Sequence, residues 1–313
     1  MIHYISGAKS FLTLLRKPEC LSQPYRVASY YLRRIFNRLH DFEEVHVPWG
    51  CTLRVRPSEY IGRRLLICGV FHLCVSEAVW RLLGPGQHAV DVGANIGYMT
   101  SIMAARVGED GRVTAFEPHP ALYHELVGNI QTWERELVSF PQIIAYNYAA
   151  SDKSGEAILE IPAKFQGNQG LCSLVSGMAF REESDYCTVA TRRLDEILRD
   201  DKPIHLLKID VEGHELEVLE GCSRLIESRQ IANVIYEDLG ACNSPTASYL
   251  RGVGYELFYL GETFSGLAVG RIDRKGQEYA REQPEGASYL ATLEADRAIS
   301  TLRKKGWRVL KLR

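Results

Sequence analysis

The sequence predicts an α/β protein built on a doubly wound, mostly parallel sheet of seven strands. Short apolar runs alternate with stretches of helical periodicity, which is the pattern of strands joined by crossover helices. A glycine-rich turn at 89–98 also leads one apolar run directly into a helical stretch, as at the carboxyl edge of a parallel sheet. The predicted strands lie near 88–92, 112–116, 142–148, 204–209, 231–236, 255–260 and 266–270, and the predicted helices near 97–107, 119–131, 214–227 and 245–252.

The ends of the chain are expected to extend this sheet domain. A short link at 261–266 joins the last two predicted strands, so the final strand should run antiparallel. Before the sheet, an amphipathic helix over 25–39, a hairpin around 48–50 and a short helix over 76–83 are predicted. The expected division is an N-terminal helical and hairpin extension over 1–83, the sheet domain over 84–271 and a helical C-terminal tail over 272–313.

An insertion is expected between the third and fourth predicted strands. Residues 157–161 and 186–190 indicate an added pair of strands. The segment 166–177 between them is polar and glycine-rich and would lie at the ligand-bearing edge of the sheet. It is either a substrate lid or a disordered loop.

The composition is that of an ordinary globular protein, with 46% hydrophobic and 24% charged residues. A formal net charge of −2 gives no electrostatic case for binding nucleic acid. Residues 1–66 nevertheless carry 11 basic and 5 acidic side chains. This excess has two explanations, solvated helix faces or peripheral contact with an anionic membrane. No apolar run is long enough to predict a transmembrane segment.

The eight cysteines are scattered and include no C-x-x-C pair. This spacing predicts reduced, mostly buried thiols in a cytoplasmic protein. The oligomeric state is not predicted.

The glycine turn predicts a nucleoside pocket. Gly93 and Gly97 permit a tight bend and close approach of a ligand, with Asn95 between them. Glu117 ends the second predicted strand, where its carboxylate can accept hydrogen bonds from a ribose diol. The turn lacks the G-x-G-x-x-G of dinucleotide folds, and Asp91 suits a cationic group better than a phosphate. The expected cofactor is therefore S-adenosylmethionine, whose ammonium and sulfonium are positively charged.

A second group of polar residues follows the fourth and fifth predicted strands. Asp210, Glu237 and Asp238 would meet at the same sheet edge. One interpretation is a site for Mg²⁺ or a similar hard cation that acidifies a substrate hydroxyl. The other is metal-free, with His214 or Asp210 removing the hydroxyl proton. Glu212 is a further candidate beside this centre.

Asp152 follows the third predicted strand and has two interpretations. It can accept a hydrogen bond from an adenine amino group, or it can simply form the turn before Gly155.

Taken in order, the motifs DVGANIGY, AFEPHP, NYAASDKSG, GLCSL, RRLDEIL and LLKIDVEGHELEVLEG resemble those of the FkbM family of methyltransferases over roughly 89–258. The resemblance implies the Rossmann-like class I methyltransferase fold and methyl transfer from S-adenosylmethionine to a hydroxyl of a sugar, glycan or polyketide-like metabolite. It also implies roles for individual residues: Gly93, Asn95 and Gly97 near the methionine portion, Glu117 at the ribose, Asp152 at the adenine, and Asp210 and Glu212 at the reaction centre. Tyr98, which ends the first motif, is a further cofactor-binding candidate.

Two other functions remain open on this kind of sheet. One is a nicotinamide-dependent oxidoreductase, against which the absent G-x-G-x-x-G counts. The other is a non-catalytic module that binds a glycan or a partner protein, because a fold does not determine a function.

Overall fold

The computed structural model describes the chain in several segments. These are residues 17–137, 139–162, 167–168, 172–175, 183–199, 202–238, 240, 243–272 and 287–311.

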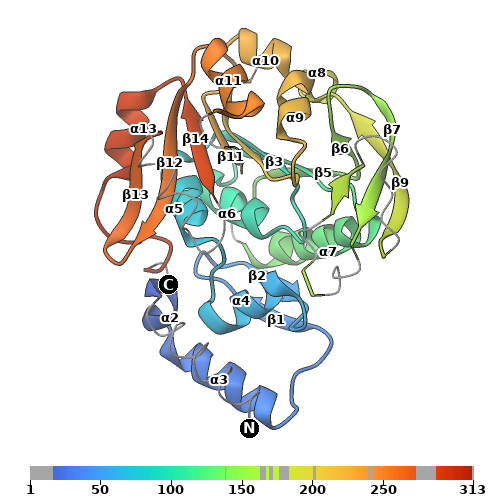
Figure 1. Cartoon of the computed structure of the whole chain (residues 1–313). Helices are drawn as coiled ribbons and strands as arrows, with labels where there is room; N and C mark the ends of the chain where they lie inside the picture. The colour runs from blue at the N-terminus through green and yellow to red at the C-terminus, as the bar shows by residue number, and fades with distance from the viewer. Residues whose placement is uncertain are drawn as a thin grey trace.

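A single mixed sheet of eight strands forms the centre of the molecule (Figure 1). In spatial order its strands are β13 (Gly266–Arg271), β12 (Glu256–Thr263), β14 (Ser288–Thr292), β11 (Asn233–Glu237), β10 (Ile204–Ile209), β3 (His88–Val92), β4 (Arg112–Phe116) and β5 (Gln142–Tyr146). The five strands from β11 to β5 are parallel neighbours. The carboxyl ends of these parallel strands therefore meet at one edge, as predicted.

The end of the sheet differs from the prediction. The strand near 266–270 exists as β13 and is antiparallel to β12. However, β14 lies between β11 and β12 and is antiparallel to both. The region 272–313, expected as a helical tail, thus supplies a central strand, and a boundary at 271 is wrong. The five residues of β14 carry no local signal that would identify an interior strand.

Helices cover both faces of the sheet. Side chains alternate between these faces along each strand, so alternate residues enter two separate hydrophobic cores. Leu206 belongs to one core and Leu207 to the other. The first core contains residues of α5 (Leu73–Leu82), α6 (Tyr98–Val107), α7 (Pro120–Glu136) and α13 (Ala295–Leu302). The second contains residues of α8 (Leu194–Ile197), α9 (Glu215–Gly221), α10 (Ser223–Glu227) and α11 (Pro245–Gly252). The helix predicted over 214–227 is therefore two helices, α9 and α10.

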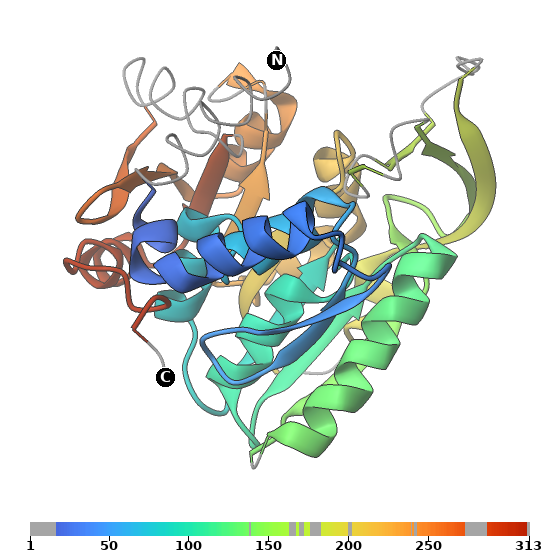
Figure 2. The same cartoon turned by 90° about the horizontal axis from the view of Figure 1, so that it is seen from below.

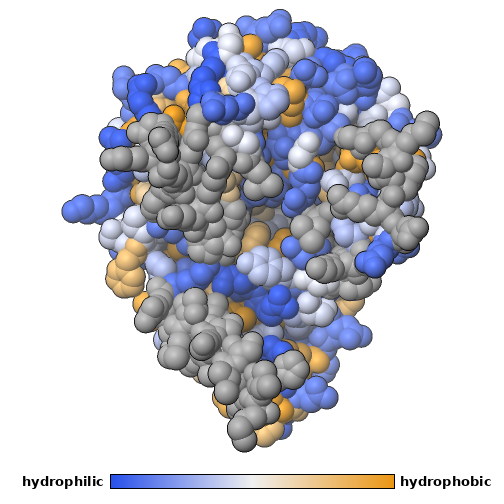
Figure 3. Space-filling view, in the orientation of Figure 1, coloured by the Kyte–Doolittle hydropathy of each residue, from blue (hydrophilic) through white to orange (hydrophobic). Residues whose placement is uncertain are grey.

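The N-terminal extension contains α2 (Pro18–Ser22), α3 (Pro24–Ile35), the hairpin of β1 (Glu43–His46) and β2 (Thr52–Val55), and α4 (Tyr60–Cys68). Figure 2 shows α3 lying across this end of the molecule. It buries Val27 and Tyr30 but exposes 55% of Leu32 and 69% of Ile35. Hydrophobic surface is visible at the lower tip in Figure 3, where α3 lies.

One cysteine pair corrects the prediction of reduced thiols. Cys20 and Cys68 are joined by a disulfide that links α2 to α4. Cys51, Cys74, Cys172, Cys187 and Cys222 are free, and Cys242 lies outside the described residues. The spacing of 48 residues between the paired cysteines gave no hint of this contact, because it depends on how the two helices pack.

The predicted strand insertion is present. β7 (Gly155–Ile161) pairs with β9 (Asp185–Arg192) in a small sheet that also holds β6 (Ala149–Ala150) and β8 (Ser173–Leu174). Only 167–168 and 172–175 of the predicted lid segment are described. Asn168 and Cys172 of these residues line the main pocket.

No single helix among the described residues is long and apolar enough to cross a bilayer; α4 and α5 meet that test only jointly, across a sharp bend.

Candidate active site

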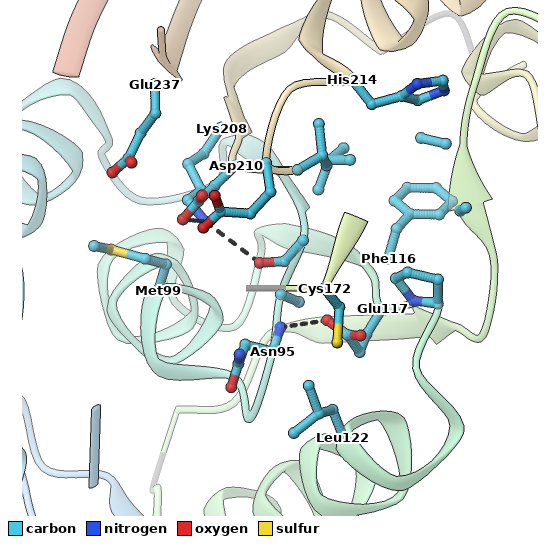
Figure 4. Close-up of a pocket in the computed structure, with 18 of the residues that line it drawn as sticks. Asn95, Met99, Phe116, Glu117, Leu122, Cys172, Lys208, Asp210, His214 and Glu237 are labelled. Carbon is cyan, nitrogen blue, oxygen red and sulfur yellow. Dashed lines mark hydrogen bonds and ion pairs between the residues drawn. The ribbon is translucent and has the colours of Figure 1, made fainter. Parts of the chain in front are cut away.

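A pocket opens at the carboxyl ends of β3, β4, β10 and β11 (Figure 4). Its lining includes eight of the residues singled out from the sequence, which are Gly93, Asn95, Tyr98, Glu117, Asp210, Glu212, His214 and Glu237. Four others, Asp91, Gly97, Asp152 and Asp238, are not part of the lining. The two predicted groups of residues thus share one pocket.

The glycine turn packs tightly against the ends of the neighbouring strands. Gly93 has a φ of +77°, and a Cβ there would lie 1.9 Å from the carbonyl oxygen of Asp210. Only glycine fits this approach. Gly97 also has a left-handed φ, of +93°, and a Cβ on it would lie 2.7 Å from Leu126 and 2.9 Å from Trp133.

Glu117 connects the turn to the second strand. Its carboxylate oxygens accept hydrogen bonds at 2.8 Å from the backbone N–H groups of Asn95 and His119. The side chain lines the pocket although the residue is only 5% exposed, and burial raises its pKa to about 7. Each oxygen keeps lone-pair capacity for a ligand hydroxyl.

Asp91 lies beneath the turn and is completely buried. Its carboxylate accepts a 2.6 Å hydrogen bond from the Thr100 hydroxyl, and the Lys208 ammonium lies 3.6 Å away. Burial raises the pKa of Asp91, while Lys208 and Thr100 oppose that rise. Any influence of Asp91 on a ligand is therefore transmitted through Lys208 and the turn.

Lys208 links the buried and the accessible acids. Its Nζ lies 3.1 Å from Asp210, whose side chain is 32% exposed, and it donates a 3.4 Å hydrogen bond to the Gly93 carbonyl. Burial would lower the pKa of Lys208, but Asp210 and Asp91 outweigh burial and raise it. The lysine thus remains a cation and fixes the positions of both carboxylates.

Glu237 enters the pocket from the end of β11 and meets two residues that the sequence did not identify. Its Oε1 lies 3.1 Å from Nδ1 of His72, and Nε2 of His72 lies 3.1 Å from the Ser288 hydroxyl. His72 precedes α5 and Ser288 begins β14, so no local motif relates them.

His214 lies on the opposite side of the pocket from Glu237 in Figure 4. Its Nε2 is 2.9 Å from the Ser151 hydroxyl, which also donates a 3.1 Å hydrogen bond to Asp152. Burial lowers the pKa of His214. The structure therefore separates His214 from the carboxylates of Asp210 and Glu237 and groups it with Asp152.

Glu212 and Glu215 differ in position. Glu212 lines the pocket and has a φ of +55°, an unusual backbone for a residue other than glycine. Glu215 begins α9, and its carboxylate accepts a 3.1 Å hydrogen bond from the N–H of Gly213. Acidic side chains are favoured at the start of a helix, so the position of Glu215 has a structural explanation.

The structure does not support the predicted Mg²⁺ site. In the described part of the chain, the only set of His, Cys, Asp or Glu ligand atoms within 4.8 Å of one another is Glu19, Cys20 and Cys68. Asp238 does not line the pocket, and its Oδ1 accepts a hydrogen bond from Gly240. Lys208 already provides the cation beside Asp210.

Known proteins resemble this chain in sequence. Hexuronic acid methyltransferase AglP of Haloferax volcanii is 30% identical over 141 residues, which cover 44% of this chain and 51% of that protein. Methyltransferase sdnD of Sordaria araneosa is 31% identical over 157 residues, which cover 42% of this chain and 59% of that protein. The matched regions thus span little more than half of either relative.

Solved structures also align with the chain. The methyltransferase FkbM from Methylobacillus flagellatus aligns over 93% of this chain and 60% of its own, at 14% identity and a TM-score of 0.39. An S-adenosylmethionine-dependent O-methyltransferase from Thermotoga maritima aligns over 81% and 86%, at 13% identity and a TM-score of 0.41.

A family match decides the identity. Residues 91–257, which include the glycine turn, Glu117 and the acidic end of β10, match the methyltransferase FkbM domain. The chain therefore belongs to the methyltransferase FkbM family.

Proposed function

We propose that this chain is an S-adenosylmethionine-dependent methyltransferase that methylates a hydroxyl group of a sugar. The observation that carries this proposal is the charge of the pocket around Lys208, where Asp210, Glu212 and Glu237 surround one ammonium. Carboxyl groups accept hydrogen bonds from hydroxyls, and their ionised forms repel anions. The similarity to a hexuronic acid methyltransferase supports a sugar acceptor. The same charge favours a neutral sugar, or a uronic acid held with its carboxylate away from these acids.

The residues present fit the cofactor. Glu117 is placed to bind the ribose diol, and the turn at Gly93 and Asn95 lets the methionine portion approach the backbone. Phe116 and Tyr148 provide apolar lining for the adenine, beside the Ser151 hydroxyl that holds His214. We therefore place Asp152 and His214 at the adenine end.

When bound, the cofactor supplies a methyl group on a positively charged sulfur. The excess of carboxylates at the end of β10 and β11 favours a positive charge there. Lys208 holds the Asp210 carboxylate in one position. The lone pairs of Asp210 that Lys208 does not use can then orient an acceptor hydroxyl. Alignment of that hydroxyl with the methyl group is the main contribution the protein can make to a direct displacement.

The test combines binding with product analysis. Calorimetry with S-adenosylmethionine and with NAD should show binding of the first alone, which separates a methyltransferase from an oxidoreductase. Methyl-labelled cofactor is then incubated with methyl glycosides of glucose, galactose, rhamnose and glucuronic acid, and NMR locates the new methyl group. An O-methyl ether is expected, with faster transfer to neutral glycosides.

Two outcomes would refute the proposal. Cofactor binding without transfer to any glycoside would favour the non-catalytic glycan-binding or partner-binding module. A methyl ester on glucuronic acid, with no ether product, would show that a carboxylate rather than a hydroxyl is the acceptor.

A further inference from the structure

Three elements far apart in the sequence bring a histidine between a carboxylate and a hydroxyl at the pocket. His72 immediately precedes α5, Glu237 ends β11 and Ser288 begins β14. The His72 ring contacts Glu237 through Nδ1 and Ser288 through Nε2, both at 3.1 Å. His72 and Glu237 line the pocket, and Figure 4 shows the Glu237 side chain directed into it near Met99.

The arrangement is fixed by its surroundings. His72 is 4% exposed and Ser288 is fully buried, so the imidazole is enclosed on the side away from the pocket. His72 also has a φ of +49°, a left-handed backbone that is uncommon for a residue other than glycine. A strained, enclosed imidazole in contact with a partly exposed carboxylate is typical of a group held in place for function.

Asp210 and Glu237 have different partners. Asp210 forms an ion pair with Lys208 at 3.1 Å. Glu237 faces His72, Lys208, Asp210, Glu212 and Glu215, a mostly acidic set. Burial and then the charge of Asp210 raise the pKa of Glu237, and Lys208 only partly opposes this. These surroundings favour the protonated form of Glu237, so its carboxylate is suited to accept a proton.

We propose that Glu237 binds the acceptor hydroxyl and takes its proton, and that His72, held by Ser288, is the positioning residue for Glu237. This inference rests on the proposed function. As the methyl group transfers, the bond from carbon to sulfur breaks and its electron pair stays on sulfur. The bond from carbon to the acceptor oxygen forms, and the hydroxyl proton moves to the carboxylate of Glu237. The Nδ1–H group of His72 donates a hydrogen bond to Oε1 of Glu237, which leaves Oε2 for the acceptor.

The kinetic test uses Glu237→Gln, which keeps a hydrogen-bond acceptor but loses basicity. Its kcat for the best glycoside should fall at least about 100-fold, the usual scale for general base catalysis, while KM changes little. Glu256→Gln, on the exposed pair with Arg271, is the matched control and should keep wild-type kinetics.

Variants of His72 test positioning. His72→Asn can keep a donor near the Nδ1 position and should retain most activity, whereas His72→Leu should lower kcat about tenfold without weakening cofactor binding. The acidic limb of the pH profile should shift in His72→Leu, because the carboxylate loses its partner. Equal losses in both variants would indicate only a structural role and overturn the positioning assignment.

A readout independent of turnover is the ¹⁵N spectrum of the histidine rings. In the complex with S-adenosylhomocysteine, the His72 Nδ1 proton should be protected from exchange, should lose protection in Glu237→Ala, and should shift when methyl β-D-glucopyranoside is added. If wild type methylates a glycoside and Glu237→Gln keeps its kcat, the inference fails while the proposed function stands. If wild type methylates no glycoside, the proposed function fails and the inference with it.

Discussion

Replacing Lys208 by methionine should destabilise the protein through one specific carboxylate. Asp91 is completely buried, and its neighbours are the ammonium of Lys208 and the hydroxyl of Thr100. Asp210 is different, because its side chain is 32% exposed and water can replace the lysine. Breaking a buried ion pair costs about 3–5 kcal/mol, and with only Asp91 stranded we expect the lower end, about 3 kcal/mol.

This loss of stability should appear as a lower Tm. An unfolding entropy of about 2.1 cal/mol/K per residue gives about 0.66 kcal/mol/K for 313 residues, so the Tm should fall by about 5 °C. The double variant Asp91→Asn with Lys208→Met removes the stranded charge and should recover most of the loss. Both are compared with wild type by scanning calorimetry near pH 7.5, with circular dichroism as the control for folding.

The choice of pH follows from the sign of the shift. Because the pKa of Lys208 is raised in the folded protein, its stabilisation is complete below the unfolded pKa and is lost only as the pH rises through the folded value. The ion pair is therefore intact at pH 7.5. A Lys208→Met protein with an unchanged Tm, or a double variant less stable than the single one, would refute this account of the site.

Three further predictions follow from the same structure. Burial raises the pKa of Glu117 to about 7. Wild type should therefore lose stability relative to Glu117→Gln as the pH rises from 4.5 to 8, by up to about 3 kcal/mol. Urea titrations measure this difference in the free energy of unfolding, and a difference that stays constant with pH would contradict the prediction. The exposed face of α3 predicts peripheral membrane contact, so Leu32→Glu with Ile35→Glu should reduce co-sedimentation with anionic vesicles, and equal sedimentation would count against it. If Cys20 and Cys68 form a disulfide, denatured protein should show two fewer alkylated cysteines without reductant than after reduction. Alkylation of every cysteine in protein from intact cells would instead support the cytoplasmic location expected from the sequence.

The predicted site residues that line the pocket share one property. Gly93, Glu117 and Asp210 each follow a strand that belongs to the parallel part of the sheet. In such a sheet the carboxyl ends of neighbouring strands must meet, so sequence position at a strand end is enough to bring these side chains together. The same reasoning placed Glu237 at the pocket, although its proposed metal partners did not assemble.

The residues that were missed depend on packing between distant elements. His72 follows α4 rather than a core strand, and Ser288 reaches the site only because β14 inserts between β11 and β12. The five residues of β14 do not indicate which two strands β14 will separate. Asp91 lies on a core strand, as predicted, but the alternation of side chains along β3 places it beneath the turn and outside the pocket lining.

The topology also explains why the acids gather on one side of the pocket. Glu237 and Asp210 end adjacent strands, β11 and β10, while Glu117 ends β4 on the far side of β3. The end of the pocket that we assign to adenosine is therefore lined by one carboxylate and aromatic residues, and the other end by several carboxylates around one lysine. A ligand whose positive charge lies at one end and whose aromatic ring lies at the other can enter such a pocket in only one favourable orientation. That orientation directs its sulfonium toward Asp210 and Glu237, where we place the acceptor hydroxyl.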